Sequence, residues 1–264
     1  MIKAAVLGSP INHSLSPFIH NRAYEILGVE GNYERHEVTA ESFDSFIELA
    51  RNSDWTGFSL TMPLKEAPLK AGFDVDSRSQ TIQSVNTLVR TGDSFRALST
   101  DVLAFDRILQ NISYHRVAII GGGGTARAAL GALDGTVDQV TMLQRGSNRN
   151  SQLVAAVSQS EIVFADLSTP LSDFDLVISA TPAGASDSLA SSIAGHAGTL
   201  IESLYKPWPT VIAHAWEQRG GHVIHGLDLL VEQALDQIHL FTNTGFDYTS
   251  MRSQLLAEVT KQIQ

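Results

Sequence analysis

The chain of 264 residues carries a formal net charge of −10, has no cysteine, and is 43% apolar and 17% charged. This length allows one large domain or two smaller ones, the acidic charge argues against nucleic-acid binding, and the lack of cysteine excludes disulfides and thiolate metal sites. The first residues lack the layout of a signal peptide, and no apolar run approaches the ~20 residues of a membrane span. We therefore expect a cytoplasmic protein that does not enter a membrane.

Short apolar runs alternate with helical patterns in the first part of the chain. The expected strands lie at 3–7, 33–38, 57–60, 87–90 and 94–98, and the expected helices run from about 17 to 27 and from 42 to 51. Alternation of this kind predicts a mostly parallel sheet covered by helices.

The stretch "GSPINHSLSPFIHN" follows the first expected strand. Because the first turn of a helix has unpaired N–H groups and tolerates proline, Ser16 is expected to cap a helix that begins at Pro17 and ends near Gly28. Side chains two positions apart in an extended segment point the same way, so Ser14 and Ser16 also present two hydroxyls near a helix N-terminus. This second interpretation predicts a site for a small carboxylate, and a plain helix cap is the alternative.

The alternation of strands and helices restarts near Asp101. The further strands are expected at 116–120, 139–143, 162–164, 176–179, 199–203 and 222–224, with helices at 102–110, 229–241 and 248–262 and a loop with a short helix at 183–198. The sequence thus predicts an α/β fold of two α/β domains, at 1–100 and 101–226, with the last helices at 227–264 packing back on the first domain.

The stretch "VAIIGGGGTARAAL" carries the strongest local motif. Gly121, Gly123 and Ala126 match G-x-G-x-x-A between an apolar strand and a helical pattern. In that context glycines let the backbone approach a pyrophosphate, and the helix N-terminus stabilises its charge. We predict a Rossmann domain that binds a dinucleotide, against the alternative of a flexible turn.

The next strand ends in "LQRGSNR", which discriminates between the two nicotinamide cofactors. An NAD site places Asp or Glu about 20 residues after the glycines to bond the ribose 2′-hydroxyl. This stretch has no acid and two arginines, Arg145 and Arg149. Because guanidinium groups pair with phosphate, we predict NADP(H), and an ordinary basic loop is the alternative.

Three other stretches place polar residues next to strands or at a helix start. They are "GFSLTMPLKEAPL", "SVNTLVR" and "LSTDVLAFDRIL", which contain Thr61, Lys65, Asn86 and Asp101. Each of these residues alone has an ordinary structural role, as a strand-end hydroxyl, a solvated lysine, a turn residue or a helix cap.

Taken together, these stretches resemble the shikimate dehydrogenase family, which includes shikimate and quinate dehydrogenases. The resemblance covers nearly the whole chain and includes "GSPINHSLSP", "LTMPLK", "SVNTL", "STD", "GGGGTARA", "LYKPWPT" and "HGLDLLVEQA". It implies an N-terminal substrate-binding domain with a mostly parallel sheet, a Rossmann NADP-binding domain, and a C-terminal helix that returns to the first domain. The implied reaction is the reversible reduction of 3-dehydroshikimate to shikimate, a step toward the aromatic amino acids.

The resemblance also implies a role for individual residues. Ser14 and Ser16 would bind the substrate carboxylate, with Tyr205 near it, and Lys65 and Asp101 would form the catalytic pair. The residues implied to bond the ring hydroxyls are Thr61, Asn86, Asp101 and Gln233. The residues implied to bind the cofactor are Gly121, Gly123, Gly124, Thr125, Ala126, Arg145, Arg149 and Gly226.

The chain departs from the family pattern at a few positions. The usual Asn-Thr-Asp-Gly and Asn-Arg-Thr become Ser99-Thr100-Asp101-Val102 and Gln144-Arg145-Gly146, and Leu229 replaces a usual methionine. A quinate/shikimate dehydrogenase that uses NAD, or a non-catalytic regulator that senses NADP(H), remain the alternative functions.

The nine histidines do not predict a metal site, because His222 and His225 would point to opposite faces of a strand and no H-E-x-x-H pattern occurs. The expected partner is a small-molecule substrate, and the protein is expected to be a monomer or a homodimer.

Overall fold

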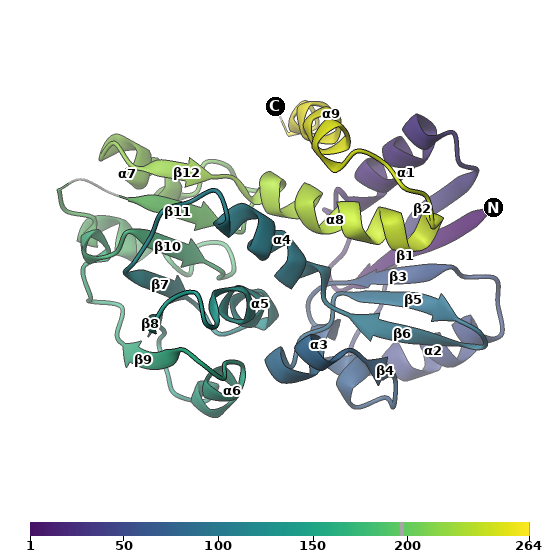
Figure 1. Ribbon diagram of the computed structural model, residues 1–264, viewed down its shortest axis with the longest axis horizontal. Helices are drawn as coiled ribbons and strands as arrows, with labels where there is room; N and C mark the ends of the chain where they lie inside the picture. The colour runs from purple at the N-terminus through teal and green to yellow at the C-terminus, as the bar shows by residue number, and fades with distance from the viewer. Residues whose placement is uncertain (196–197, 264) are drawn as a thin grey trace. The chain divides into compact units, whose positions relative to one another are not determined.

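The computed structural model describes residues 1–195 and 198–263 and divides into two compact units (Figure 1). Unit 1 comprises Met1–Leu103 together with the chain from Leu230 onward, and unit 2 comprises Ala104–Leu229. The divisions fall inside helices α4 (Thr100–Leu109) and α8 (Gly226–Thr242), near the sequence boundaries at 100/101 and 226/227. Because each helix continues across the division between the units, its residue pattern does not show the exact position of that division.

Unit 1 is built on a six-stranded sheet with the order β2-β1-β3-β5-β6-β4. Its strands are β1 (Ile2–Gly8), β2 (Gly31–Glu37), β3 (Gly57–Leu60), β4 (Asp74–Val75), β5 (Thr87–Thr91) and β6 (Ser94–Leu98). β1 pairs in parallel with β2 and β3, whereas β5 runs antiparallel to both β3 and β6.

This topology brings several chain segments to one edge of the sheet. The carboxyl ends of β1, β3 and β6 meet the amino end of β5 there, because Ser59 pairs with Thr87 and Thr87 pairs with Leu98. Backbone bonds extend the alignment past the strands: Leu60 N donates to Asn86 O at 2.7 Å, and Asn86 N donates to Leu98 O at 3.2 Å. The segments that follow β3 and β6 and precede β5 are therefore neighbours.

Both faces of the unit 1 sheet are covered. Along β1, Ile2, Ala4 and Val6 join one apolar cluster and Ala5 and Leu7 join another, as the two-residue period of a strand requires. The helices of this unit are α1 (Ser16–Leu27), α2 (Phe43–Arg51), α3 (Ser77–Ile82), α8 and α9 (Tyr248–Thr260), with the 3-10 helix η1 (Leu64–Leu69). The return of α8 and α9 to this unit confirms the predicted C-terminal connection.

The start of α1 differs from the prediction. The N-cap residue is Leu15, with a helical backbone (φ −91°, ψ −3°), so Ser16 does not cap the helix and the segment from Ser14 to Ser16 is not extended. The Ser14 hydroxyl instead accepts the Ser16 N–H at 3.3 Å. The helix ends at Gly28 with φ +63°, as expected for a left-handed C-cap.

Unit 2 is a parallel sheet with the order β12-β11-β10-β7-β8-β9. Its strands are β7 (Val117–Ile120), β8 (Gln139–Leu143), β9 (Glu161–Ala165), β10 (Leu176–Ser179), β11 (Thr199–Glu202) and β12 (His222–Ile224). The helices are α5 (Gly124–Leu133), α6 (Asn150–Ala155) and α7 (Val211–Gln218), with the 3-10 helices η2 (Leu171–Asp173) and η3 (Asp187–Ser192). The strand order reverses beside β7, which is the doubly wound Rossmann arrangement and confirms the predicted α/β fold.

Most of the short elements were not predicted. α3 and α6 each have six residues, which is less than two helical turns and too short for a helical periodicity to be recognised. Asp76 nevertheless marks the start of α3, because its side chain accepts the N–H groups of Arg78 and Ser79. Thr210 caps α7 in the same way. The expected short helix at 183–198 is η3, and residues 196 and 197 of that range lie outside the described residues. Of the residues that are described, none belongs to a helix long and apolar enough to cross a membrane.

Candidate active site

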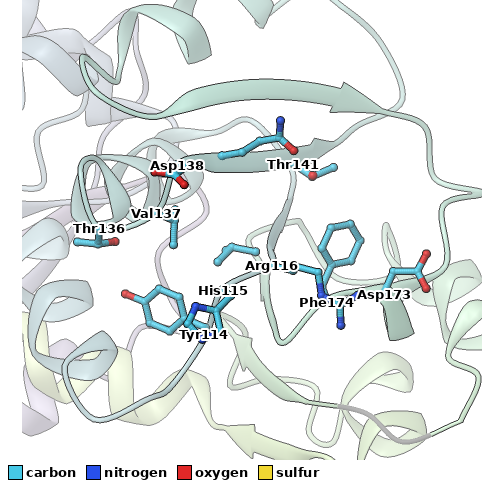
Figure 2. Close-up of a pocket in the computed structure, with 11 residues that line it drawn as sticks. Tyr114, His115, Arg116, Thr136, Val137, Asp138, Thr141, Asp173 and Phe174 are labelled. Carbon is cyan, nitrogen blue, oxygen red and sulfur yellow. The ribbon is translucent and has the colours of Figure 1, made fainter.

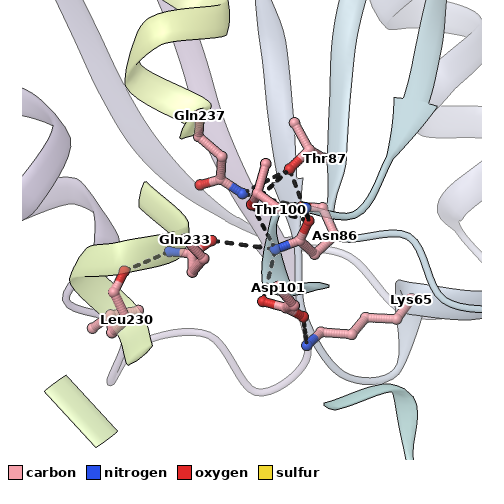
Figure 3. Close-up of polar contacts among 8 residues, drawn as sticks. All are labelled: Lys65, Asn86, Thr87, Thr100, Asp101, Leu230, Gln233 and Gln237. Carbon is pink, nitrogen blue, oxygen red and sulfur yellow. Dashed lines mark hydrogen bonds and ion pairs between the residues drawn. The ribbon is translucent and has the colours of Figure 1, made fainter. Parts of the chain in front are cut away.

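A lysine and an aspartate form a close ion pair at the polar edge of the unit 1 sheet (Figure 3). Lys65 Nζ lies 2.6 Å from Asp101 Oδ2, and the two side chains are 18% and 8% exposed. Lys65 stands in η1, directly after β3, and its carbonyl accepts the N–H of Val85 at 2.8 Å. Asp101 stands in the first turn of α4, where the helix dipole favours a negative charge.

Asn86 holds the second oxygen of Asp101. Its Nδ2 donates to Asp101 Oδ1 at 2.8 Å, while its Oδ1 accepts the backbone N–H of Thr100 at 2.7 Å. Because a backbone N–H can only donate, the amide group has one possible orientation. Asn86 is 2% exposed, so water does not compete for these hydrogen bonds.

Helix α8 supplies the fourth member of this cluster. Gln233 Oε1 accepts from Asn86 Nδ2 at 3.3 Å, and Gln233 Nε2 donates to the carbonyl of Leu230 at 2.7 Å (Figure 3). Hydrogen bonds thus join Lys65, Asn86, Asp101 and Gln233, which all came from the sequence prediction. The arrangement offers one ammonium group, held by a carboxylate, that can donate a proton to an oxygen beside it.

The other predicted hydroxyls of unit 1 lie at the same edge of the sheet. Thr61 follows β3 and donates its N–H to the carbonyl of Leu7 at 2.9 Å. Ser14 and Ser16 are 7% and 6% exposed; Ser14 lies between β1 and α1, and Ser16 is the first residue of α1. The Ser14 hydroxyl accepts the N–H of Ser16, and the Ser14 carbonyl accepts from Arg35 Nη2 at 3.0 Å.

In unit 2 the glycine loop connects β7 to α5. Gly121 has φ +110°, and a Cβ there would lie 2.6 Å from the carbonyl of Ala180, so this position requires glycine. Gly123 is the N-cap of α5, and a Cβ at Gly123 would meet only Arg149, at 3.8 Å. The loop therefore presents bare backbone beside the first turn of α5, which contains Gly124, Thr125 and Ala126 and no acidic residue.

The two predicted arginines follow β8. Arg149 Nη1 donates to the carbonyl of Gly122 at 3.0 Å, which places its guanidinium against the glycine loop. Arg145 is exposed, and Gln144 donates to Asn150 across the same turn. Bare backbone, a helix N-terminus and two arginines suit a dinucleotide that carries an extra phosphate, so these residues fit NADP.

Tyr205 and Gly226 both lie in unit 2. Tyr205 follows β11, in a segment that the buried carboxylate of Glu202 holds through the N–H of Leu204 (3.1 Å) and the hydroxyl of Thr210 (3.0 Å). Burial raises the pKa of Glu202. Gly226 begins α8, and a Cβ there would lie 2.5 Å from the carbonyl of Leu204, so only glycine allows this close approach.

Comparison with known proteins decides the family. Residues 6–88 match the family model of the shikimate dehydrogenase substrate binding domain, and residues 104–189 match that of shikimate / quinate 5-dehydrogenase. A shikimate dehydrogenase (NADP(+)) of Staphylococcus aureus (strain MSSA476) is 30% identical over 98% of this chain and 99% of that protein. The crystal structure of Mycobacterium tuberculosis shikimate dehydrogenase is 33% identical, with a TM-score of 0.87 over 98% of this chain and 100% of the other.

The chain belongs to the shikimate dehydrogenase family. A third relative, the shikimate 5-dehydrogenase of Thermus thermophilus, was solved in complex with NADP(H) and shikimate; it is 28% identical, with a TM-score of 0.85 over 98% of this chain and 99% of the other.

Three residues that depart from the shikimate dehydrogenase pattern lie either in the core or on the surface. Val102 and Leu229 are buried, 1% and 6% exposed, so both pack as core residues. Gly146 is exposed, and a Cβ there would meet nothing within 4 Å. Packing therefore does not require glycine at this position.

Three polar residues next to the cluster were not predicted from the sequence. Thr87, Thr100 and Gln237 are buried and bond to Asn86. Thr87 and Thr100 adjoin residues that the motifs had singled out. Gln237 lies one helical turn after Gln233, so two glutamines on one face of the helix were the available signal.

Metal ligands do not gather in the part of the chain that the structure describes: no group of three or more histidine or acidic residues there could hold an ion. His225 lies beyond the end of β12, where its ring packs on Trp208 with centroids 3.6 Å apart. Its Nδ1 accepts the N–H of Leu227 at 2.9 Å, and burial lowers the pKa of His225.

Proposed function

We propose that this chain catalyses the reversible, NADP-dependent reduction of 3-dehydroshikimate to shikimate. The observation that carries the proposal is the Lys65–Asp101 pair inside a hydrogen-bonded polar cluster. Relatives that align over nearly the entire chain are named as NADP-dependent shikimate dehydrogenases, and the arginines beside the glycine loop suit the extra phosphate of NADP.

The roles of the protein groups follow from the charge that develops in the reaction. Bound NADPH supplies a hydride to the carbonyl carbon of the substrate. Negative charge then grows on the carbonyl oxygen, and the Lys65 ammonium donates a proton to it. Asp101 holds that ammonium in place, and in the direction of oxidation Lys65 accepts the proton again. General acid catalysis of this kind typically contributes about 10²- to 10⁴-fold in rate.

The binding roles remain proposals. Ser14 and Ser16, at the start of α1, would bind the substrate carboxylate, since the N–H groups and dipole of a first helical turn favour an anion. The proposed partners of the ring hydroxyls are Thr61, Asn86, Asp101 and Gln233. Tyr205 is a predicted substrate contact. The predicted cofactor contacts are Gly121, Gly123, Gly124, Thr125, Ala126, Arg145, Arg149 and Gly226. All of these residues belong to one chain, so a monomer or a homodimer would be complete.

One assay tests the function and its alternatives. Purified protein is mixed with shikimate or quinate, each with NADP⁺ or NAD⁺, and the absorbance of the reduced nicotinamide is followed. We expect the fastest reaction with shikimate and NADP⁺. Reaction only with quinate and NAD⁺ would support a quinate enzyme, and no reaction in any of the four mixtures would support a non-catalytic sensor of NADP(H).

A further inference from the structure

A line of buried hydrogen bonds leads through unit 1 toward the catalytic pair. It starts at Tyr33, whose hydroxyl donates to Ser59 Oγ at 2.5 Å. Ser59 Oγ donates to Gln237 Oε1 at 2.7 Å, and Gln237 Nε2 donates to Thr87 Oγ1 at 2.9 Å. Gln237 on α8 therefore links β3 to β5 across the sheet edge.

The line continues from β5 to the ion pair (Figure 3). Thr87 Oγ1 donates to Asn86 Oδ1 at 2.9 Å, and Asn86 Nδ2 donates to Asp101 Oδ1 at 2.8 Å. The other oxygen of Asp101 faces Lys65. Each group in the line thus donates one step closer to the carboxylate.

Backbone groups fix the direction of this line at both amides. Gln237 Nε2 also lies 3.3 Å from the carbonyl of Asn86, which can only accept, so the oxygen of the Gln237 amide must face Ser59. The Thr87 hydroxyl then accepts from Gln237 and directs its own hydrogen to Asn86. At Asn86 the N–H of Thr100 fixes the amide in turn.

The surroundings keep the line neutral and dry. Gln237 and Thr87 are fully buried, and Ser59 and Tyr33 are 5% and 1% exposed. His20 stacks on Tyr33 with ring centroids 3.9 Å apart, and its Nε2 pairs with Gln237 Oε1 at 3.2 Å. In such a low-dielectric setting an unpaired polar group is costly, which strengthens the preference for one arrangement.

We propose that Gln237 and Thr87 are positioning residues for the reaction. Through their hydrogen bonds they help to fix the amide of Asn86. Asn86 in turn fixes Oδ1 of Asp101, so that Oδ2 holds the ammonium of Lys65. This inference rests on the proposed function. Without the Thr87 hydroxyl, Asn86 Oδ1 loses one of its donors and the link to Gln237 is broken. The N–H of Thr100 still sets the orientation of the Asn86 amide, but the amide is held less firmly against Asp101, and the ammonium of Lys65 is positioned less accurately. Small displacements of reacting groups are costly in rate, so we expect a loss on the order of tenfold.

The kinetic test compares Thr87→Val, Thr87→Ser and Tyr24→Phe. Valine keeps the shape of threonine without its hydroxyl, and serine keeps the hydroxyl. Tyr24→Phe is the control, because it removes another buried hydroxyl of unit 1 that has no hydrogen-bond partner. We expect Thr87→Val to lower kcat for shikimate oxidation about tenfold with KM for NADP⁺ unchanged, Thr87→Ser to restore kcat, and Tyr24→Phe to match the original protein. Gln237→Met, which also removes the link, should lower kcat as Thr87→Val does and serves if that variant does not fold.

A second measurement does not depend on activity. In the free protein, the side-chain amide protons of Asn86 should exchange slowly with water by NMR, and Thr87→Val should accelerate this exchange about tenfold or more. Unchanged exchange together with kcat within twofold of the original protein would overturn the positioning role. If the original protein oxidises no shikimate, the proposed function fails, and the exchange of Asn86 still decides whether Thr87 fixes this amide.

Discussion

Acidification should destabilise this protein through His20. Burial lowers the pKa of His20 from 6.5 to about 3, against a smaller opposing effect of its bond to Gln237. The unfolded chain takes up a proton near pH 6.5 whereas the folded chain does not, so stability falls as the pH drops below 6.5 and this loss stops near pH 3. Each pH unit in this window corresponds to ~1.36 kcal/mol, so the contribution of His20 at pH 5 amounts to about 2 kcal/mol.

Urea unfolding at pH 7 and pH 5 measures this contribution. His20→Phe keeps an aromatic ring on Tyr33 and cannot titrate, and the acidic groups remain the same in both proteins. The original protein should therefore lose about 2 kcal/mol more than His20→Phe between the two pH values. His239→Phe, at an exposed histidine of the same unit, should lose as much as the original protein. Equal losses in the original protein and His20→Phe would show that burial does not hold His20 neutral.

Three further substitutions test the predicted cofactor site in the glycine loop and in the segment after β8. Arg149→Ala should raise KM for NADP⁺ about tenfold or more and leave KM for NAD⁺ unchanged, because only NADP⁺ carries the 2′-phosphate; equal effects on both cofactors would contradict this. Gly146→Thr adds a hydroxyl where a side chain has room and should lower KM for NADP⁺ a few-fold; an unchanged KM would count against this placement of the phosphate. Gly121→Ala should lower the melting temperature and abolish the NADP⁺ binding that calorimetry measures. The reason is that φ is +110° at this position and the new Cβ would lie 2.6 Å from the carbonyl of Ala180. Binding near the original affinity would show that the loop tolerates a side chain.

Much of the fold could be predicted because buried strands and their turns leave a local signature. The expected strands at 57–60, 94–98 and 139–143 coincide with β3, β6 and β8. These strands are short, begin with a glycine or a polar residue and place apolar residues at alternate positions, so pattern and structure agree. The glycine motif likewise specifies a strand, a turn and a helix start within a few residues, and β7 and α5 flank it as expected.

The start of α1 shows the limit of local reasoning. Sequence preferences favoured Ser16 as the cap, but the chain turns one residue earlier and Leu15 takes a helical backbone. Leucine ranks far below serine as an N-cap residue, so the sequence alone could not place the helix start at Leu15.

The positions of Gln237 and Thr87 were out of reach for a different reason. Gln237 meets Thr87 and Ser59 through bonds that join residues 150 and 178 positions apart in the chain. No periodicity encodes such a contact. The contact depends on the return of α8 to the sheet of unit 1. The family resemblance implied this return, but it did not show which side chains of α8 face the sheet.

We propose that the Lys65 ammonium moves the proton in this reaction. Steady-state rates of shikimate oxidation and calorimetric binding of shikimate should be measured for Lys65→Ala, with Lys70→Ala as the control at an exposed lysine of the same segment. We expect Lys65→Ala to lower kcat about 10²- to 10⁴-fold and to change the shikimate dissociation constant little, whereas Lys70→Ala should leave both unchanged. A Lys65→Ala protein with near-normal kcat would contradict this proposal.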